Sequence, residues 1–390
     1  MIKVKLKNYD TSEKYQYHAR TLEIRVSSST SITTPIRGIT STEMSAKATI
    51  PAEIPIDAEI GEIMIKLTTG KRRNIGSFLR KNSAYKSISR SLLYQKLIMQ
   101  YFPLTFALLQ PTNTAISFLH EHNYVDKFIR MSLALQIEDL GMDIITIPWV
   151  AYPPEKLVKV YWSYQKSYPN KIVVPFISLK DSHYVEKFLK TTAPYLDQLR
   201  FIGVLYKPVA DVRPSYDHLW STLYDKDVAI ILADVKRDQD VSLVPNLSVP
   251  HYTEFVVGDV ITREVPHGAG SYRPPHPVDT RIKFFNREDL TVNPLLRVKQ
   301  EHGWIERISE TLGREEFVVK ALEHYQEAQE NTEKFNILNA ISKVHEFKES
   351  REEFIRSQEY IKQTDTIDYI KEKGTLKKVF LEMSKQKTLF

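Results

Sequence analysis

Short apolar runs recur along the first three quarters of this 390-residue chain, and they constrain its fold more than any other feature. A strand with one wet face alternates apolar and polar residues, whereas a continuous apolar strand is buried on both faces, as in a parallel sheet. Eight runs fit the second pattern: residues 33–38, 104–109, 143–147, 172–177, 201–205, 228–233, 254–258 and 282–285.

The spacing of these runs indicates how they are connected. Several consecutive runs lie about 28 residues apart, which is roughly the length of one strand and its helix. The segments between them favour helices, such as residues 113–140, whose apolar face ends at Gly141. Eight such units predict an α/β protein with a TIM-like (β/α)8 barrel over residues 31–294. An open doubly wound sheet is the main alternative, but no run is followed by its G-x-G-x-x-G loop.

Both flanks of the predicted barrel differ from it in pattern. Residues 2–6 and 22–26 alternate strictly, which predicts a small β segment over residues 1–30 that covers one end of the barrel. Residues 63–67 form a third alternating stretch. After Pro294 the chain becomes highly charged, so residues 295–390 are predicted to be a helical extension packed on the barrel. Its tail, residues 371–390, is either loose or a docking helix.

Composition removes several classes of site. The chain has no cysteine, which excludes disulfides, thiolate metal sites and a cysteine nucleophile. The eleven histidines show no metal-ligand spacing, and no P-loop or nucleotide motif occurs, so neither a metal nor a cofactor is expected. The first residues do not resemble a signal peptide and no apolar run is long enough to span a membrane, so we expect a cytoplasmic protein without membrane contact.

Reactive residues of an α/β barrel gather at the carboxyl ends of its strands. Asp234 and Asp259 each follow directly after an apolar run, where a carboxylate is partly desolvated and rigidly held. Both are therefore candidate catalytic residues, although each can instead cap a helix or pair with a nearby cation. The polar residues at the other strand ends are candidate substrate-binding residues: Arg37, Gln110, Asn113, Lys207, Arg263 and His267.

A second candidate site is a dense group of basic residues between the predicted strands. It contains Lys71, Arg72, Arg73, Arg80 and Lys81, with Tyr85 and Tyr94 within or beside it. Cations interleaved with aromatic rings suit phosphate contact combined with base stacking, so this group is a candidate site for RNA or DNA. The net charge of +6 permits such a partner but does not require it. The alternative is a solvated basic helix face.

Three stretches resemble the tRNA-guanine transglycosylase family. Residues 33–43 (TTPIRGITSTE) are similar to the entry strand of that family's barrel, residues 258–263 (GDVITR) to its late aspartate-bearing strand, and residues 281–286 (RIKFFN) to the strand that closes it. The family includes archaeal and DNA-modifying branches that exchange guanine for a deazaguanine base. The resemblance implies a TIM barrel in which Asp259 attacks the ribose C1′. The family's zinc-binding cysteines and its Ser-Gly-Gly-Phe-Gln loop are absent from this sequence.

Two hypotheses about function follow. The first is a transglycosylase-like barrel enzyme that acts on a nucleic-acid base or nucleoside, with Asp259 and Asp234 as its carboxylates. The second is a non-catalytic barrel that binds nucleic acid through the basic group, or binds a protein partner or a second copy of the chain through its C-terminal helices.

Overall fold

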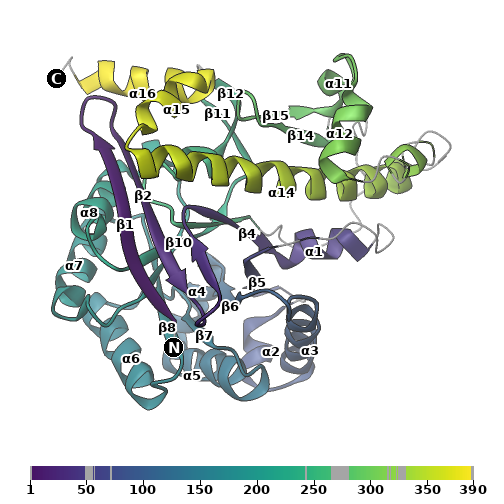
Figure 1. The fold of residues 1–390 in the computed structure, drawn as a ribbon. Helices are drawn as coiled ribbons and strands as arrows, with labels where there is room; N and C mark the ends of the chain where they lie inside the picture. The colour runs from purple at the N-terminus through teal and green to yellow at the C-terminus, as the bar shows by residue number, and fades with distance from the viewer. Residues whose placement is uncertain are drawn as a thin grey trace.

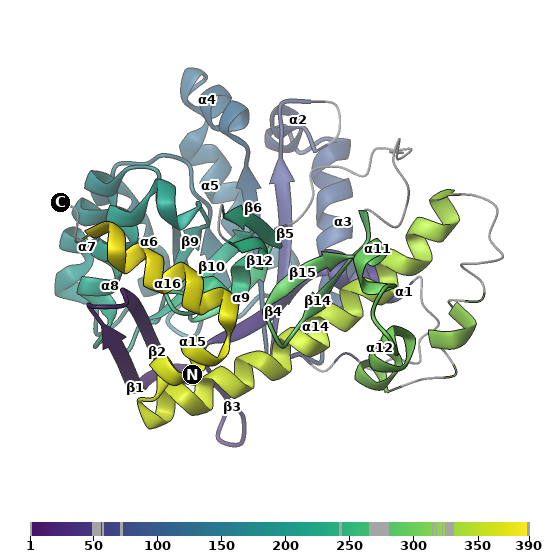
Figure 2. The same ribbon diagram turned by 90° about the horizontal axis from the view of Figure 1, so that it is seen from above.

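The computed structural model describes residues 2–48, 56, 58–70, 73–241, 244–264, 281–313, 316, 318–321, 323 and 331–387. Eight parallel strands close into a barrel in the order β10-β13-β4-β5-β6-β7-β8-β9, which confirms the TIM-like prediction (Figures 1 and 2). Their bounds are Ile36–Thr40 (β4), Ile60–Leu67 (β5), Leu104–Pro111 (β6), Ile144–Ile147 (β7), Ile172–Ser178 (β8), Phe201–Leu205 (β9), Ala229–Val235 (β10) and Val260–Arg263 (β13).

Helices follow most of the strands on the outside of the barrel. They are α1 (Ser41–Ala48), α2 (Ile75–Leu79), α3 (Ser83–Ile98), α4 (Asn113–Glu121), α5 (Val125–Ala134) with the π-helical turn η1 (Leu135–Asp139), α6 (Pro154–Ser167), α7 (Ser182–Thr192) and α8 (Arg213–Leu223). The helix predicted over residues 113–140 is thus divided. Asn123, between α4 and α5, has a φ of 56°, which interrupts a right-handed helix.

Two of the eight predicted barrel strands do not belong to the barrel, and one true barrel strand was not predicted as such. Residues 254–258 follow the short helix α9 (Val249–Thr253) and precede β13. Residues 282–285 overlap β14 (Lys283–Asn286), which lies outside the barrel. Its four-stranded sheet contains β11 (Asp238–Val241), β12 (Val244–Ser248), β15 (Thr291–Pro294) and β14. The alternating residues 63–67 belong instead to the second barrel strand, β5.

The N-terminal segment closes the amino end of the barrel, as expected. β1 (Lys3–Ser12) and β2 (Tyr17–Arg25) form an antiparallel hairpin, and β3 (Ser31–Thr33) pairs with β2. Val4, Leu22 and Ile24 share one buried cluster with the interior side chains Ile36 and Ile60 of the barrel. The hairpin therefore acts as an apolar plug beneath the barrel.

The C-terminal region packs on the barrel through one long helix. Its helices are α11 (Leu295–Val298), α12 (Trp304–Leu312), α14 (Asn331–Gln363), α15 (Thr366–Glu372) and α16 (Gly374–Lys387). Helix α14 contacts β4, α1, β14 and the β1–β2 hairpin, and Figure 1 shows it crossing the molecule between these elements. In α16, Phe380 is buried against the rings of Tyr252 and Phe255, so the described part of the tail is a docking helix.

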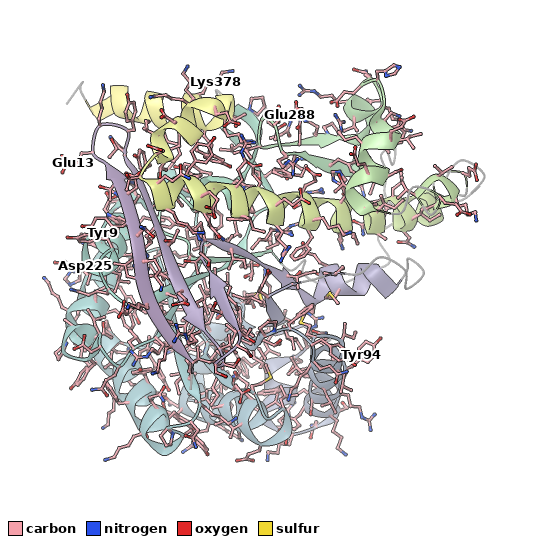
Figure 3. The ribbon with its side chains drawn as sticks, viewed as in Figure 1. Tyr9, Glu13, Tyr94, Asp225, Glu288 and Lys378 are labelled. Carbon is pink, nitrogen blue, oxygen red and sulfur yellow. The ribbon has the colours of Figure 1, made fainter. Side chains whose placement is uncertain are left out.

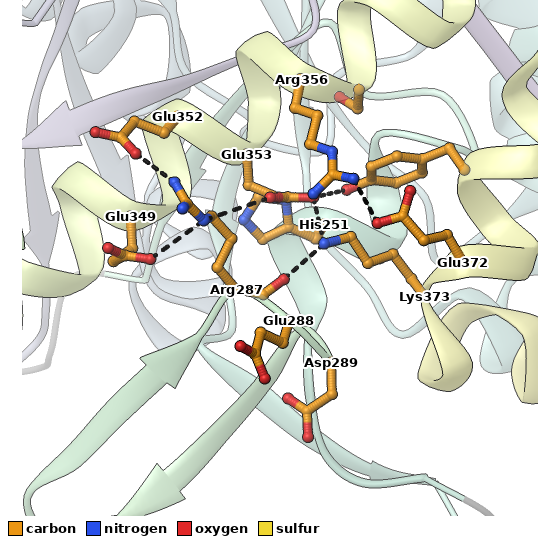
Figure 4. A network of polar contacts seen from close by, with 12 residues as sticks. His251, Arg287, Glu288, Asp289, Glu349, Glu352, Glu353, Arg356, Glu372 and Lys373 are labelled. Atoms are coloured by element: carbon orange, nitrogen blue, oxygen red, sulfur yellow. Dashed lines mark hydrogen bonds and ion pairs between the residues drawn. The ribbon is translucent and has the colours of Figure 1, made fainter. Parts of the chain in front are cut away.

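Buried polar contacts also hold this region in place (Figure 4). Glu353 on α14 is fully buried, forms an ion pair of 2.8 Å with Lys373 and accepts a hydrogen bond of 2.7 Å from the Tyr369 hydroxyl. The Lys373 ammonium also donates to the carbonyl of Arg287, in the turn after β14. Each buried charge is therefore paired, which is the condition for burying one without a large cost.

Candidate functional site at the carboxyl end of the barrel

A cavity of about 220 Å³ opens at the carboxyl ends of the barrel strands. Its walls come from β5, β6, β8, β9 and β10 and the loops that follow them. The polar lining residues are Lys66, Gln110, Thr112, Asn113, Trp149, Ser178, Lys180, Tyr206, Lys207 and Asp234. Four residues expected at the strand ends by sequence thus meet in one place: Asp234, Gln110, Asn113 and Lys207.

Asp234 is the carboxylate of this cavity. It has a φ of 64°, in the left-handed region, and the pairing of β10 with β13 is irregular between residues 232 and 235. The irregularity turns the Asp234 side chain to the mouth, where it is 27% exposed and 2.7 Å from the Lys66 ammonium. Lys66 itself is almost fully buried. Strained backbone that presents a charged side chain is frequent at functional sites.

Glu62 lies on the same strand as Lys66, four positions earlier and therefore deeper in the barrel. Its carboxyl group is fully buried. Burial raises its pKa to about 8, and the nearby charges of Asp234 and Glu43 act in the same direction, whereas Thr262 and Lys66 oppose the shift. With this pKa Glu62 keeps its proton at neutral pH close to the carboxyl group of Asp234, and a protonated carboxyl group can act as a general acid.

Lysines give the mouth an excess of positive charge. Burial lowers the pKa of Lys207, and so do the charges of Lys180, Lys236 and Lys66, while Asp234 opposes them. Four ammonium groups thus act on one another here, against the carboxylates of Asp234 and Glu264. Such a cavity attracts an anionic substrate.

Gln110 has a different role from the one expected of it. Its amide nitrogen donates hydrogen bonds of 2.9 Å to the carbonyls of Pro111 and Trp149, and its oxygen accepts one of 3.0 Å from the Trp149 amide. These bonds fix the loop after β7. They hold the Trp149 ring, which meets Tyr184 edge to face, at the wall of the cavity. Asn113 is the first residue of α4 and is exposed at the rim of the cavity.

The chain was compared with known proteins at this point. No protein-family model matches it, and no curated protein does. Within the described residues, no helix is long and apolar enough to cross a membrane. The same residues contain no cluster of three or more His, Asp and Glu side chains that could hold a metal ion.

Asp259 does not lie at the cavity, so its predicted position is wrong. It comes directly before β13, at the amino end of the barrel. Arg20 of the N-terminal hairpin holds it through two bonds, of 3.0 Å from Nε and 2.6 Å from Nη2, and the Ile230 amide donates a third of 2.7 Å. Both side chains are buried. Asp259 thus anchors the plug to the barrel, and the two aspartates lie at opposite ends.

Arg37 and Arg263 also lie outside the cavity, contrary to expectation. Arg37 is 1% exposed and pairs with Glu43 of α1 and Glu346 of α14. Arg263 lies 3.3 Å from Glu43 and 3.1 Å from Glu346. Burial would raise the pKa of Glu43, but Arg37 and Arg263 lower it to about 2. Together with Arg237, 2.6 Å from Glu346, they form an ion network that joins α14 to the barrel.

The remaining predicted residues fall into two groups. His267, Lys71 and Arg72 lie outside the described residues. Arg73, Arg80 and Lys81 are exposed beside α2 and are not among the residues that line the cavity.

Sequence reasoning missed Lys66 and Glu62. Both are charged residues within a stretch whose other members are apolar, and that alternation suggested a strand with one wet face. Alternate residues of a barrel strand point to the same side, so Glu62 and Lys66, four positions apart, were bound to share one side of the strand. That shared side is the interior of the barrel.

Proposed function

We propose that this chain is a barrel enzyme that cleaves or exchanges the glycosidic bond of a phosphate-bearing nucleoside, either free or within nucleic acid. The observation that carries the proposal is the partly exposed Asp234 carboxylate, paired with Lys66 and lying near the neutral, buried Glu62. Glycosidic bonds break through an oxocarbenium-like transition state, which an adjacent carboxylate stabilises or captures. The sequence resemblance to transglycosylases suggests the same chemistry, with Asp234 in the role expected of Asp259.

The proposed reaction has two displacement steps at C1′. Asp234 attacks C1′, so that a carbon–oxygen ester bond forms while the bond from C1′ to the base nitrogen breaks. Glu62 supplies the proton that the departing base requires. Water or an incoming base then attacks C1′ and displaces Asp234, and the proton of that nucleophile returns to Glu62, which restores both residues.

The cations of the mouth fit the remainder of such a substrate. Lys180 and Lys207 line the cavity and can hold a phosphate, and α4 directs the positive end of its helix dipole to the same rim. The partly exposed ring of Trp149 offers an apolar wall for a base.

The test compares base release and base exchange by the wild type with those of Asp234→Asn and Glu62→Gln. Nucleoside 5′-monophosphates and oligonucleotides serve as substrates, with liberated base measured by chromatography. Glu62→Gln removes the acid and should slow base release by about 10²–10⁴-fold. Asp234→Asn should slow it by at least the same factor. Asp225→Asn, an exposed carboxylate outside the cavity, is the matched control. Turnover unchanged in Asp234→Asn would remove the proposal.

The alternative is a non-catalytic barrel that binds nucleic acid. The exposed basic residues beside α2 and on α3 favour it, because they lie outside the cavity. It is preferred if oligonucleotides bind the chain and neither the wild type nor any variant releases base.

A further inference from the structure

Helix α3 exposes an unusual row of large apolar and aromatic side chains. Leu93 is 45% exposed, Tyr94 62%, Leu97 54%, and Tyr101, just after the helix, 86%. Lys86 and Arg90 precede them at the same three- and four-residue spacing, so Lys86, Arg90, Leu93, Tyr94 and Leu97 lie on one face of α3, and Tyr101 follows just beyond its end. The opposite face of α3 is buried through Ile88 and Leu92. The row therefore forms the solvent-exposed face of a helix whose other face is packed against the protein.

The charge around this row has one sign. The chain contains 48 Asp and Glu residues, yet none lies between Glu62 and Glu121. Within this interval Arg73, Arg80, Lys81, Lys86 and Arg90 are exposed. Asp139, an acidic residue from outside this interval, accepts a hydrogen bond of 2.8 Å from the Tyr85 hydroxyl. The surface thus presents several cations together with exposed rings.

The surface also begins at the cavity. Lys66 ends β5 inside the mouth, and the chain returns through the bridge between Thr68 and Asn74 to start α2. Helix α3 then runs down the outside of the barrel to Met99 and Phe102, which lie beside Ile2 near the amino end. Its 16 residues span about 24 Å. A polymer bound along α3 would therefore point, in the direction of the amino end of α3, to the end of the barrel that holds the mouth.

We propose that this face docks a single-stranded nucleic acid. Phosphates contact Arg80, Lys86 and Arg90, and unpaired bases stack on Tyr94 and Tyr101. Rings exposed to this extent beside cations are the features of single-strand binding, because any unpaired base offers a face for stacking. A duplex conceals its base faces and would leave both rings unused. The inference deepens the proposed function, on which its link to the mouth rests, by naming a polymer as the source of the nucleoside.

Binding can be measured by fluorescence anisotropy with the full chain and a labelled oligo(dT) or oligo(U) of about 16 nucleotides, the upper length covered by one binding module. Tyr94→Ala with Tyr101→Ala should weaken binding by about tenfold or more, as expected for loss of a stacked base. Replacing Arg80, Lys86 and Arg90 by Gln should reduce the slope of log K against log salt by about two, since each single-strand phosphate contributes about 0.7.

Tyr9→Ala and Lys5→Ala on β1 are matched controls, and Figure 3 shows Tyr9 and Tyr94 on opposite sides of the molecule. Both controls should bind as the wild type does. The inference is overturned if the wild type binds no oligonucleotide at low salt, if the tyrosine variant binds equally well, or if only duplex or anionic lipid vesicles bind. The Asp234→Asn variant separates the two proposals: it should retain binding whether or not the mouth is an active site.

Discussion

At the scale of single residues, the two aspartates show how position along a strand decides a role. Asp234 lies at the carboxyl end of β10, one residue before its last, and is partly exposed beside a lysine. Asp259 precedes its strand and is enclosed by Arg20 and the Ile230 amide. In sequence both follow an apolar run, so residue type and local pattern were the same. The two differ because residues 254–258 form the turn after helix α9 instead of a strand.

The Arg20–Asp259 pair gives a prediction about stability. Asp259→Asn leaves a buried guanidinium without its carboxylate and should lower the free energy of unfolding by about 3–5 kcal/mol. Urea denaturation followed by circular dichroism measures the change. Asp225→Asn, at an exposed position, should cost about 0.5 kcal/mol or less in the same assay. A similar effect at Asp259 and Asp225 would contradict the assignment of the anchor.

Glu62 gives a prediction about pH. Below its ordinary pKa of 4.5 the carboxyl is neutral in both folded and unfolded chains. Between 4.5 and about 8 the unfolded chain loses this proton while the folded chain keeps it, so the free energy of unfolding falls as pH rises. The loss amounts to about 1.4 kcal/mol for each pH unit at most, and it is complete above the folded-state pKa.

Glu62→Gln removes this contribution. The variant should therefore gain stability relative to the wild type as pH rises from 5 to about 8. Urea midpoints of both proteins across this interval provide the measurement. Parallel pH dependence of the two would show that Glu62 is ionised in the folded state.

At the scale of elements, apolar strands were predictable and polar-bearing ones were not. Runs such as residues 172–177 and 201–205 are buried on both faces, so their composition reveals them. β5 carries Glu62 and Lys66 inside the barrel, and therefore looked half-exposed. The run at 282–285 is apolar because β14 packs against α12 and α14, an interface that no local pattern reports. The site was recovered only where its residues followed a correctly assigned strand.

Helix α14 gives a prediction at this scale. Glu346 pairs with Arg37, Arg237 and Arg263. Glu346→Gln removes this shared carboxylate, and of the three guanidinium groups only Arg37 and Arg263 also contact Glu43. The variant should lose about 3–5 kcal/mol in chemical denaturation. Glu359→Gln, an exposed position on the same helix paired with Lys362, should change stability by about 0.5 kcal/mol or less. Equal effects would mean that α14 is held by its apolar contacts alone.

At the scale of the whole molecule, the barrel separates stability from chemistry. The plug, Arg20 and Asp259 close the amino end, whereas Asp234, Lys66 and the lysines occupy the carboxyl end. Barrel enzymes generally divide their two ends in this way. The effects of two substitutions on the free energy of unfolding should therefore add when they lie at opposite ends of the barrel. They should depart from additivity when both lie at the same end.

Double-mutant cycles test this division. Asp259→Asn combined with Asp234→Asn should give a change in unfolding free energy equal to the sum of the single changes within about 0.5 kcal/mol, as for distant sites. Glu62→Gln combined with Asp234→Asn should depart from additivity by more than that, because the charge of Asp234 raises the pKa of Glu62. The coupling should shrink at pH 5, where Glu62 is protonated in the folded chain with or without Asp234. Additivity of the second pair at pH 8 would mean that the two carboxyl groups do not share a site.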